Sequence, residues 1–190
     1  DGKITLLNRL ADKYPNSPYA VSALYEKGRS YVQGRNNSQA IATFRELLNK
    51  YPESPVSRKA AAEIGLLYYQ NDDYNRAIEA YKYVITQYPG SEEARLAMRD
   101  LKSIYVEANR VDEFAALATQ MPGAIRFEPN EQDSLTYIAA EKVYMKGEII
   151  PARESFTRYL QSYPNGAFSL NAHYYLSLIG KEQKDETGVL

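Results

Sequence analysis

The sequence predicts an all-α fold built from repeated antiparallel helix pairs, and three observations support this. The dipeptide Tyr-Pro recurs at Tyr14-Pro15, Tyr51-Pro52, Tyr88-Pro89 and Tyr163-Pro164. The first three prolines are 37 residues apart, and the last interval of 75 residues is close to two such periods. Within each period, apolar residues follow helical spacing on both sides of a short polar turn. A fixed period of this length is the signature of a helical repeat protein.

The helix boundaries follow from residues that recur in each period. Proline lacks an amide hydrogen and clashes with the preceding turn, so Tyr-Pro ends a helix. Ser17-Pro18 and Ser54-Pro55 then begin the next one, because serine caps free amides and proline suits the first helical position. At the third junction, Ser91 precedes two glutamates that complement the helix dipole. Each period therefore reads as cap, helix, turn, helix and stop.

Small and aromatic residues inside each period have a spacing that resembles the tetratricopeptide repeat. The residues that carry this match are Gly28, Tyr31, Ala40, Phe44 and Pro52 in the first unit and Gly65, Tyr68, Ala77, Tyr81 and Pro89 in the second. The unit is three residues longer than the common form. That longer form is similar to envelope lipoproteins of Gram-negative bacteria such as BamD and the Tol-Pal-associated factor. The resemblance implies a right-handed superhelical solenoid that binds proteins and has no catalytic activity.

The repeats are expected to form one array over residues 1–190, with about five helix pairs. Residues 3–13 read as a lone second helix, and the third unit has a short second helix at about residues 111–121. An irregular junction at 122–131 is expected to kink the superhelix. The fourth unit recovers the pattern, and a fifth first helix runs over about residues 167–181. Residues 185–190 fall where its partner helix should begin. Because both end units look incomplete and the chain starts at Asp1, we expect a segment of a longer protein.

Composition excludes several classes of function. The 44% apolar and 25% charged residues are typical of a folded globular chain. The formal net charge of −1 gives no electrostatic reason to expect nucleic acid or an anionic membrane as a partner. No apolar run reaches the length of about 18 residues that a membrane-spanning helix needs, so no direct membrane insertion is expected. The absence of cysteine excludes thiolate catalysis, disulfides and cysteine-bound metal.

No residue set predicts catalysis, a metal or a cofactor. His173 is the single histidine, so a multi-histidine metal site is excluded. By repeat phase it lies where the family packs a large residue against its neighbours, and a structural role is expected. The carboxylates fall mainly on turns and outer helix faces, and the glycines stand singly instead of forming a phosphate loop. The sequence therefore predicts a protein that is not an enzyme and needs no cofactor.

The resemblance implies a concave groove lined by the first helix of each pair. Tyrosine and arginine are common at binding hot spots, so an exposed tyrosine ladder there suits a peptide or protein segment. The alternative is that these rings pack along the inner wall and meet no ligand. The implied groove residues are Tyr25, Arg29, Gln33, Leu66, Tyr69, Gln70, Arg99, Ser103, Glu107, Tyr137, Glu141, Tyr144 and Tyr174.

The leading hypothesis is a scaffold that helps assemble a bacterial cell-envelope complex, in the periplasm or at the outer membrane. The alternatives are a ligand- or peptide-sensing regulatory domain of a larger signalling or transcription protein, which would be cytoplasmic, and a weaker reading as a carbohydrate-binding module. Repeats that clamp acidic chaperone tails need basic residues and asparagine at places that hold Tyr25, Arg29, Glu63, Leu96 and Asp100 here. No heat-shock chaperone tail is therefore expected as a partner.

Overall fold

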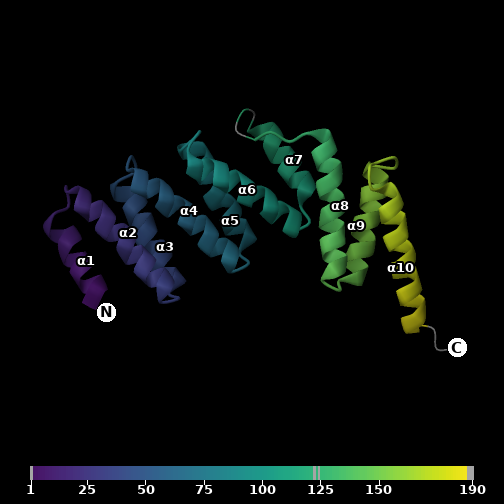
Figure 1. Ribbon diagram of the computed structural model, residues 1–190, viewed down its shortest axis with the longest axis horizontal. Coiled ribbons are helices and arrows are strands. Elements are labelled where there is room, and N and C mark those ends of the chain that lie inside the picture. The colour runs from purple at the N-terminus through teal and green to yellow at the C-terminus, as the bar shows by residue number, and fades with distance from the viewer. Residues whose placement is uncertain (1, 122, 124, 188–190) are drawn as a thin grey trace. The chain divides into compact units, whose positions relative to one another are not determined.

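The computed structural model describes residues 2–121, 123 and 125–187, and this part of the chain contains ten helices and no strand (Figure 1). The helices are α1 (Gly2–Lys13), α2 (Pro18–Gln33), α3 (Asn37–Lys50), α4 (Pro55–Gln70), α5 (Tyr74–Gln87), α6 (Glu92–Glu107), α7 (Val111–Gln120), α8 (Pro129–Met145), α9 (Ile149–Ser162) and α10 (Ser169–Thr187). The predicted all-α class of consecutive helix pairs is confirmed.

The helix ends lie where the repeated motifs place them. The helices α1, α3, α5 and α9 each end one residue before the tyrosine of a Tyr-Pro pair. The side chain of Ser17 accepts a hydrogen bond from the amide of Tyr19 at 3.2 Å, with Pro18 as the first residue of α2. Ser54 caps α4 in the same way, because its hydroxyl oxygen accepts from the amide of Val56 at 3.3 Å. Local sequence alone therefore sets these boundaries.

The turn inside each helix pair uses one residue in the left-handed conformation. The φ angles of these residues are +57° at Arg35, +57° at Asp72, +55° at Asn109 and +78° at Gly147. The amide of the residue that follows each of them donates to the carbonyl five residues earlier, as from Asp73 to Tyr68 at 3.0 Å. Only glycine adopts this conformation without steric cost. The repeat therefore keeps the turn geometry even where its sequence lacks glycine.

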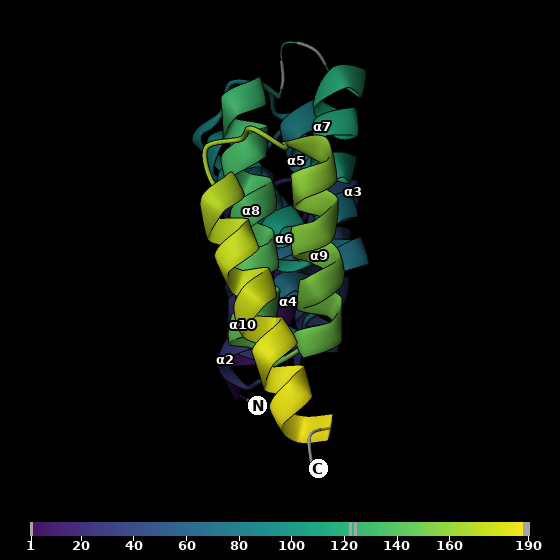
Figure 2. The same ribbon diagram turned by 90° about the vertical axis from the view of Figure 1, so that its right-hand side faces the viewer.

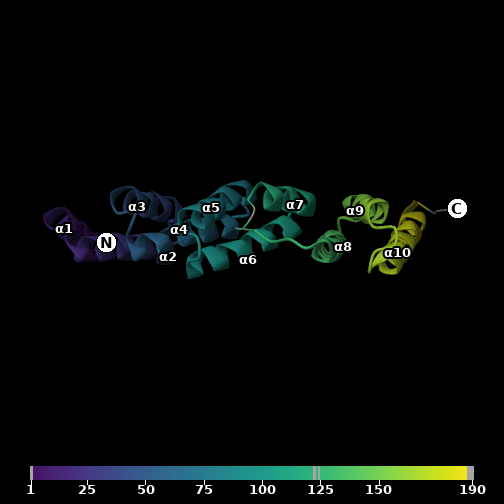
Figure 3. The ribbon, with the colours of Figure 1, turned by 90° about the horizontal axis from the view of Figure 1, so that it is seen from above.

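The chain packs as two compact units, residues 1–101 and residues 102–190, and each is described by itself. In the first unit, α2 and α4 lie in one layer while α3 and α5 lie in the other (Figure 3). Its core contains Leu24 of α2, Phe44 and Leu47 of α3, and Ile64 and Leu67 of α4, together with small residues between them. Burial of these side chains is the main stabilising contribution.

Glycine allows the paired helices of the first unit to approach closely. A Cβ atom on Gly28 would lie 2.3 Å from the ring of Phe44, and one on Gly65 would lie 2.6 Å from the ring of Tyr81. Each aromatic ring thus lies directly on the backbone of the neighbouring helix. The glycine and aromatic positions that carry the tetratricopeptide resemblance are therefore in contact in both repeats.

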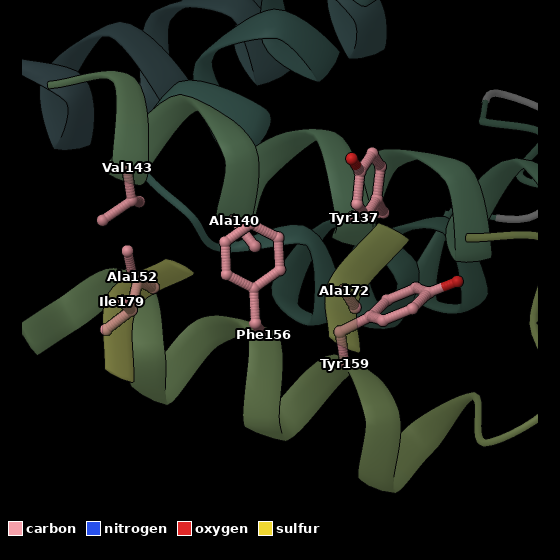
Figure 4. Packing of buried hydrophobic residues seen from close by; sticks show 8 residues of the cluster. All are labelled: Tyr137, Ala140, Val143, Ala152, Phe156, Tyr159, Ala172 and Ile179. Atoms are coloured by element: carbon pink, nitrogen blue, oxygen red, sulfur yellow. The ribbon is translucent and has the colours of Figure 1, made fainter. Parts of the chain in front are cut away.

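In the second unit, α8, α9 and α10 surround a core rich in aromatic residues (Figure 2). Figure 4 shows the ring of Phe156 beside Ala140, which occupies the place of the repeat glycine. Val143 and Ile179 complete one end of this cluster, and Tyr159 lies at the other end. This packing corresponds to the fourth unit of the sequence pattern.

The helix pair before this core departs from the repeat because its two small residues are replaced. Lys102 and Phe114 stand 37 residues after Gly65 and Ala77. The ring of Phe114 is buried between Tyr105 and Phe127, with ring centroids 5.6 and 4.9 Å away. Phe127, which precedes α8, also packs against a small buried cluster of Val106, Val111 and Ala139. The short helix α7 and the irregular connection after it therefore share one packing arrangement.

Two expectations near the end of the chain are wrong. The helix α10 continues to Thr187 and does not end near Lys181, so residues 185–187 do not begin a second helix; residues 188–190 lie outside the described part. His173 is exposed on α10 instead of packed against neighbours. Repeat phase placed His173 where Ala61 is buried in α4, but no described helix packs on α10 as α5 packs on α4.

Candidate functional site

The residues predicted to line a groove are divided between the two units. Tyr25, Arg29, Gln33, Leu66, Tyr69, Gln70 and Arg99 belong to the first, and Ser103, Glu107, Tyr137, Glu141, Tyr144 and Tyr174 belong to the second. All of them lie on the first helix of a pair, as expected. Each group is described within its own unit.

Tyr25, Arg29 and Glu63 form a polar cluster between α2 and α4. The guanidinium of Arg29 contacts the carboxylate of Glu63 at 3.2 Å. Tyr25 is half-buried, with its ring centroid 5.8 Å from that of Phe44. Burial and the nearby Glu63 carboxylate raise the pKa of Tyr25. The ring is thus held by the core while Arg29 remains exposed, so the cluster presents a fixed surface.

The other predicted residues of α2 and α4 extend this surface. Leu66 lies 37 residues after Arg29 and is 36% exposed. Gln33 and Gln70 are likewise one repeat apart, and both are exposed. Tyr69 is half-buried, with its ring centroid 6.1 Å from that of Tyr74. The first unit therefore presents an exposed leucine among an arginine and two amides.

Arg99 is held by a neighbouring acid. Its guanidinium lies 2.9 Å from Asp100 Oδ1, and the other oxygen of Asp100 accepts a hydrogen bond from the hydroxyl of Tyr81 at 3.4 Å. Burial and the charge of Asp100 raise the pKa of Tyr81. The Asp100 carboxylate therefore connects the exposed Arg99 to a core tyrosine.

Tyr137 is buried, and the expectation that its ring is exposed in a groove is wrong. Only 5% of the residue is accessible, and its ring stacks on Phe168 with centroids 4.6 Å apart. The rings of Phe156 and Tyr159 lie at 6.0 and 5.8 Å. Its hydroxyl donates to Glu141 at 3.1 Å. The aromatic residues of α9 and of the α9–α10 connection draw this ring inward.

Glu141 joins α8 to α10 through a second tyrosine. Its Oε1 atom accepts hydrogen bonds from Tyr137 and from Tyr175, the latter at 2.9 Å. The hydroxyl of Tyr144 donates to Glu182 at 2.8 Å. Two predicted residues, Glu141 and Tyr144, therefore help to hold α10 against α8.

The remaining predicted residues of the second unit lie at its surface. Tyr174 is 63% exposed, and Ser103 is also exposed. Glu107 is half-buried and lies 3.8 Å from the ammonium of Lys142. Among the six predicted residues of this unit, Tyr174 is thus the aromatic side chain most accessible to a partner.

A comparison with protein families places most of the chain in a known family. The profile of the YfiO family, described as an outer membrane lipoprotein, matches residues 20–182. The chain belongs to the YfiO family. Membership supports the predicted kinship with BamD-like tetratricopeptide proteins and an association with the bacterial envelope. A search of curated proteins gives no match.

The comparison with solved structures finds helical repeat proteins. Two are crystal structures of nearly identical TPR-like repeats described as a kinesin light chain from Podosopora anserina, one of them a single-residue variant. They are 14% and 15% identical in sequence, each with a TM-score of 0.46. The variant match covers 84% of both chains, and the other covers 85% of this chain and 87% of that one.

The site chemistry of this YfiO-family chain suits contact with another protein. In the part that the structure describes, no cluster of three or more histidine and acidic side chains is arranged to hold a metal ion. None of the helices described is both long and apolar enough to cross a membrane. The exposed residues of the α2–α4 face offer an arginine, two amides and a leucine.

Two residues outside the predicted set contact it, one in each unit. Glu63 follows Arg29 by 34 residues, close to one period, and this spacing signals a contact between adjacent repeats. Tyr175 follows Glu141 by the same interval. The shared interval of 34 residues, three fewer than the repeat period, is the sequence signal that could have identified both pairs.

Proposed function

We propose that this chain is a non-catalytic scaffold that binds a protein segment on the α2–α4 face and helps assemble a bacterial cell-envelope complex. The observation that carries the proposal is the exposed surface formed by Arg29, Leu66 and the two glutamines above a fixed core. Membership of an outer membrane lipoprotein family supports the envelope setting.

The proposed contact residues are a subset of the groove residues that the sequence predicted. The proposal keeps Arg29, Gln33, Leu66 and Gln70 in the first unit and Tyr174 in the second as the principal contacts. Tyr137 is removed because its ring is buried. Tyr25 and Tyr69 are supporting residues, since both side chains are partly buried against the core. Glu141 and Tyr144 act by holding α10 in place.

The proposed partner is a protein, and acidic chaperone tails are not expected to bind. Glu63 and Asp100 put carboxylates at two of the places where tail-binding repeats carry basic residues or asparagine. The like charges would repel an acidic tail. Nucleic acid is not proposed, since the chain carries 23 basic and 24 acidic residues. The proposed location is the periplasmic side of the envelope.

The test compares two double variants in a pull-down from the envelope fraction of the source organism. Arg29→Glu with Leu66→Glu alters the exposed α2–α4 face, while Ser38→Ala with Gln39→Ala alters the exposed face of α3. We expect the first pair to reduce recovery of the partner about tenfold or more, because central contacts dominate binding energy. The second pair should leave recovery unchanged. Circular dichroism checks that both variants stay helical; equal recovery by both would refute the proposed face.

A further inference from the structure

A groove of about 550 Å³ lies on the second-helix layer of the first unit, between α3 and α5. Its floor is formed by Ala61, Ile64 and Tyr68 of α4, and its walls include Leu48 of α3 and Tyr83 of α5. Ala61 and Ile64 are buried core residues. The volume falls within the range of sites that accommodate small ligands or the anchoring side chains of a peptide.

The groove is lined by two residues that are smaller than their equivalents in the preceding repeat. Ala61 stands 37 residues after Leu24, and Leu24 is a core residue that is only 4% exposed. On the adjoining wall, Ala80 takes the place of Thr43. Both changes shorten the side chain between neighbouring second helices. The space is thus a property of this repeat and not of the repeat pattern.

Arg45 supplies a positive charge at the rim of the groove. Arg45 donates a hydrogen bond from Nη2 to the hydroxyl of Tyr68 at 3.0 Å. The guanidinium of Arg76 lies 5.7 Å from the centre of the same ring and 3.3 Å from Asp73. Arg45 has no carboxylate partner within the described ranges. An arginine beside an apolar groove is suited to bind a carboxylate.

At the opposite wall, Glu79 is neutralised by Lys82 at 3.0 Å, so it does not offset the Arg45 charge. Tyr83 is 40% exposed there and offers a ring at the rim. An apolar floor with a polar rim and a cation at that rim is complementary to an acidic amphipathic segment. A helix laid into such a groove recognises its target through apolar side chains one turn apart.

We propose that this groove binds an amphipathic helical segment of a partner protein, with large apolar side chains over Ala61 and an adjoining aspartate or glutamate at Arg45. This site lies on the layer opposite the α2–α4 face. It goes beyond the proposed function, because it gives the first unit a second docking surface with a different chemical preference.

The test uses defined peptides and not an unidentified partner. The probe is a fluorescein-labelled, alanine-based helical peptide with two leucines four residues apart and glutamates on the adjoining face. A matched peptide carries lysine at the glutamate positions, and another carries alanine at the leucine positions. Fluorescence anisotropy with the whole chain measures binding. We expect the acidic peptide to bind about tenfold or more tightly than either matched peptide.

Two variants test the groove independently. Ala61→Leu restores the side chain that the preceding repeat carries, and it should fill the groove. Arg45→Glu reverses the charge at the rim without touching the core. Each should weaken binding of the acidic peptide about tenfold or more. Ala42→Leu and Lys59→Glu make the same changes at exposed positions outside the groove and should leave binding unchanged.

The outcomes separate this site from the α2–α4 face. Arg29→Glu with Leu66→Glu should retain peptide binding even if it abolishes recovery of the envelope partner. Equal affinity for the acidic and lysine peptides would overturn the proposal, and so would acidic-peptide binding that neither Ala61→Leu nor Arg45→Glu weakens. Absence of binding up to about millimolar peptide would overturn it as well. If the Ala61→Leu variant fails to fold, the effect of Arg45→Glu on binding of the acidic peptide alone tests the proposal.

Discussion

The hydroxyl of Tyr51 donates a hydrogen bond to the carbonyl oxygen of Pro15 at 2.5 Å, and Tyr88 makes the same contact with Pro52 at 3.3 Å. In these two Tyr-Pro motifs, the tyrosine thus binds the proline of the preceding motif. The carbonyl of Tyr51 in turn accepts from the buried hydroxyl of Ser57 at 2.6 Å. The motif therefore stops a helix and joins consecutive repeats.

Removing the Tyr51 hydroxyl should weaken this connection between repeats. We expect Tyr51→Phe to lower the free energy of unfolding by about 1 kcal/mol, the usual net contribution of one hydrogen bond. Urea unfolding followed by circular dichroism measures the change. Tyr14→Phe is the matched control, because Tyr14 belongs to the same motif and makes no such contact in the described part of the chain. Equal loss in the two variants would contradict the assigned role.

The glycine beneath the Tyr81 ring should not tolerate a methyl group. We expect Gly65→Ala to destabilise the chain by about 1–3 kcal/mol, because the new Cβ atom would lie 2.6 Å from that ring. Gly180→Ala in α10 meets no atom within 4 Å, so it should be neutral or slightly stabilising through helix propensity. Thermal unfolding of both variants checks this. A stabilised Gly65→Ala variant would show that the helices can separate at no cost.

The helix boundaries could be predicted because each depends on residues a few positions apart. Ser54-Pro55 begins α4 and Tyr51-Pro52 ends α3 through local hydrogen bonding and sterics. The contact of Gly65 with Tyr81 follows from fixed repeat spacing. All of these features arise within one repeat or at one junction between repeats.

The direction of particular side chains could not be predicted from repeat phase. Tyr137 shares the expected face with Tyr144, yet aromatic residues of α9 and the following connection draw its ring into the core. In the helix pair before α8, Lys102 and Phe114 stand at the positions of the small residues, so the repeat pattern is interrupted there. The groove between α3 and α5 is lined by residues of three helices, including Ala61 of α4. It could not be predicted because it forms only when these helices pack together.

The left-handed residue in the first intra-repeat turn offers a stabilising substitution. Arg35 is exposed and has a φ angle of +57°, which is costly for a residue with a Cβ atom. We expect Arg35→Gly to raise the free energy of unfolding by about 0.5–1 kcal/mol, partly offset by the greater freedom of glycine in the unfolded chain. Gly147→Ala makes the reverse change at the equivalent turn and should destabilise. Chemical denaturation compares the two; a destabilised Arg35→Gly variant would argue against backbone strain.

Tyr159 should make the stability of the second unit sensitive to alkaline pH. Its hydroxyl donates to Asp133 at 2.6 Å and accepts from the amide of Phe168 at 3.0 Å. Asp133 also accepts from the amide of Ala167 at 2.9 Å, which holds the end of the α9–α10 connection, just before α10. Burial and the hydrogen bond to the Asp133 carboxylate raise the pKa of Tyr159 to about 12.

Because the pKa in the folded state lies above the ordinary value of about 10, folding favours the protonated phenol. The resulting stabilisation is fully present below about pH 10 and is lost as the pH rises through about 12. We therefore expect the unfolding free energy of the parent chain to fall more steeply over this window than that of Tyr159→Phe. Urea unfolding at a series of pH values measures the difference, and titration of other groups cancels in the comparison.

Tyr19→Phe, which removes an exposed hydroxyl, is the control and should follow the parent curve. Parallel curves for the parent and Tyr159→Phe would mean that the Asp133 contact does not hold the proton on Tyr159.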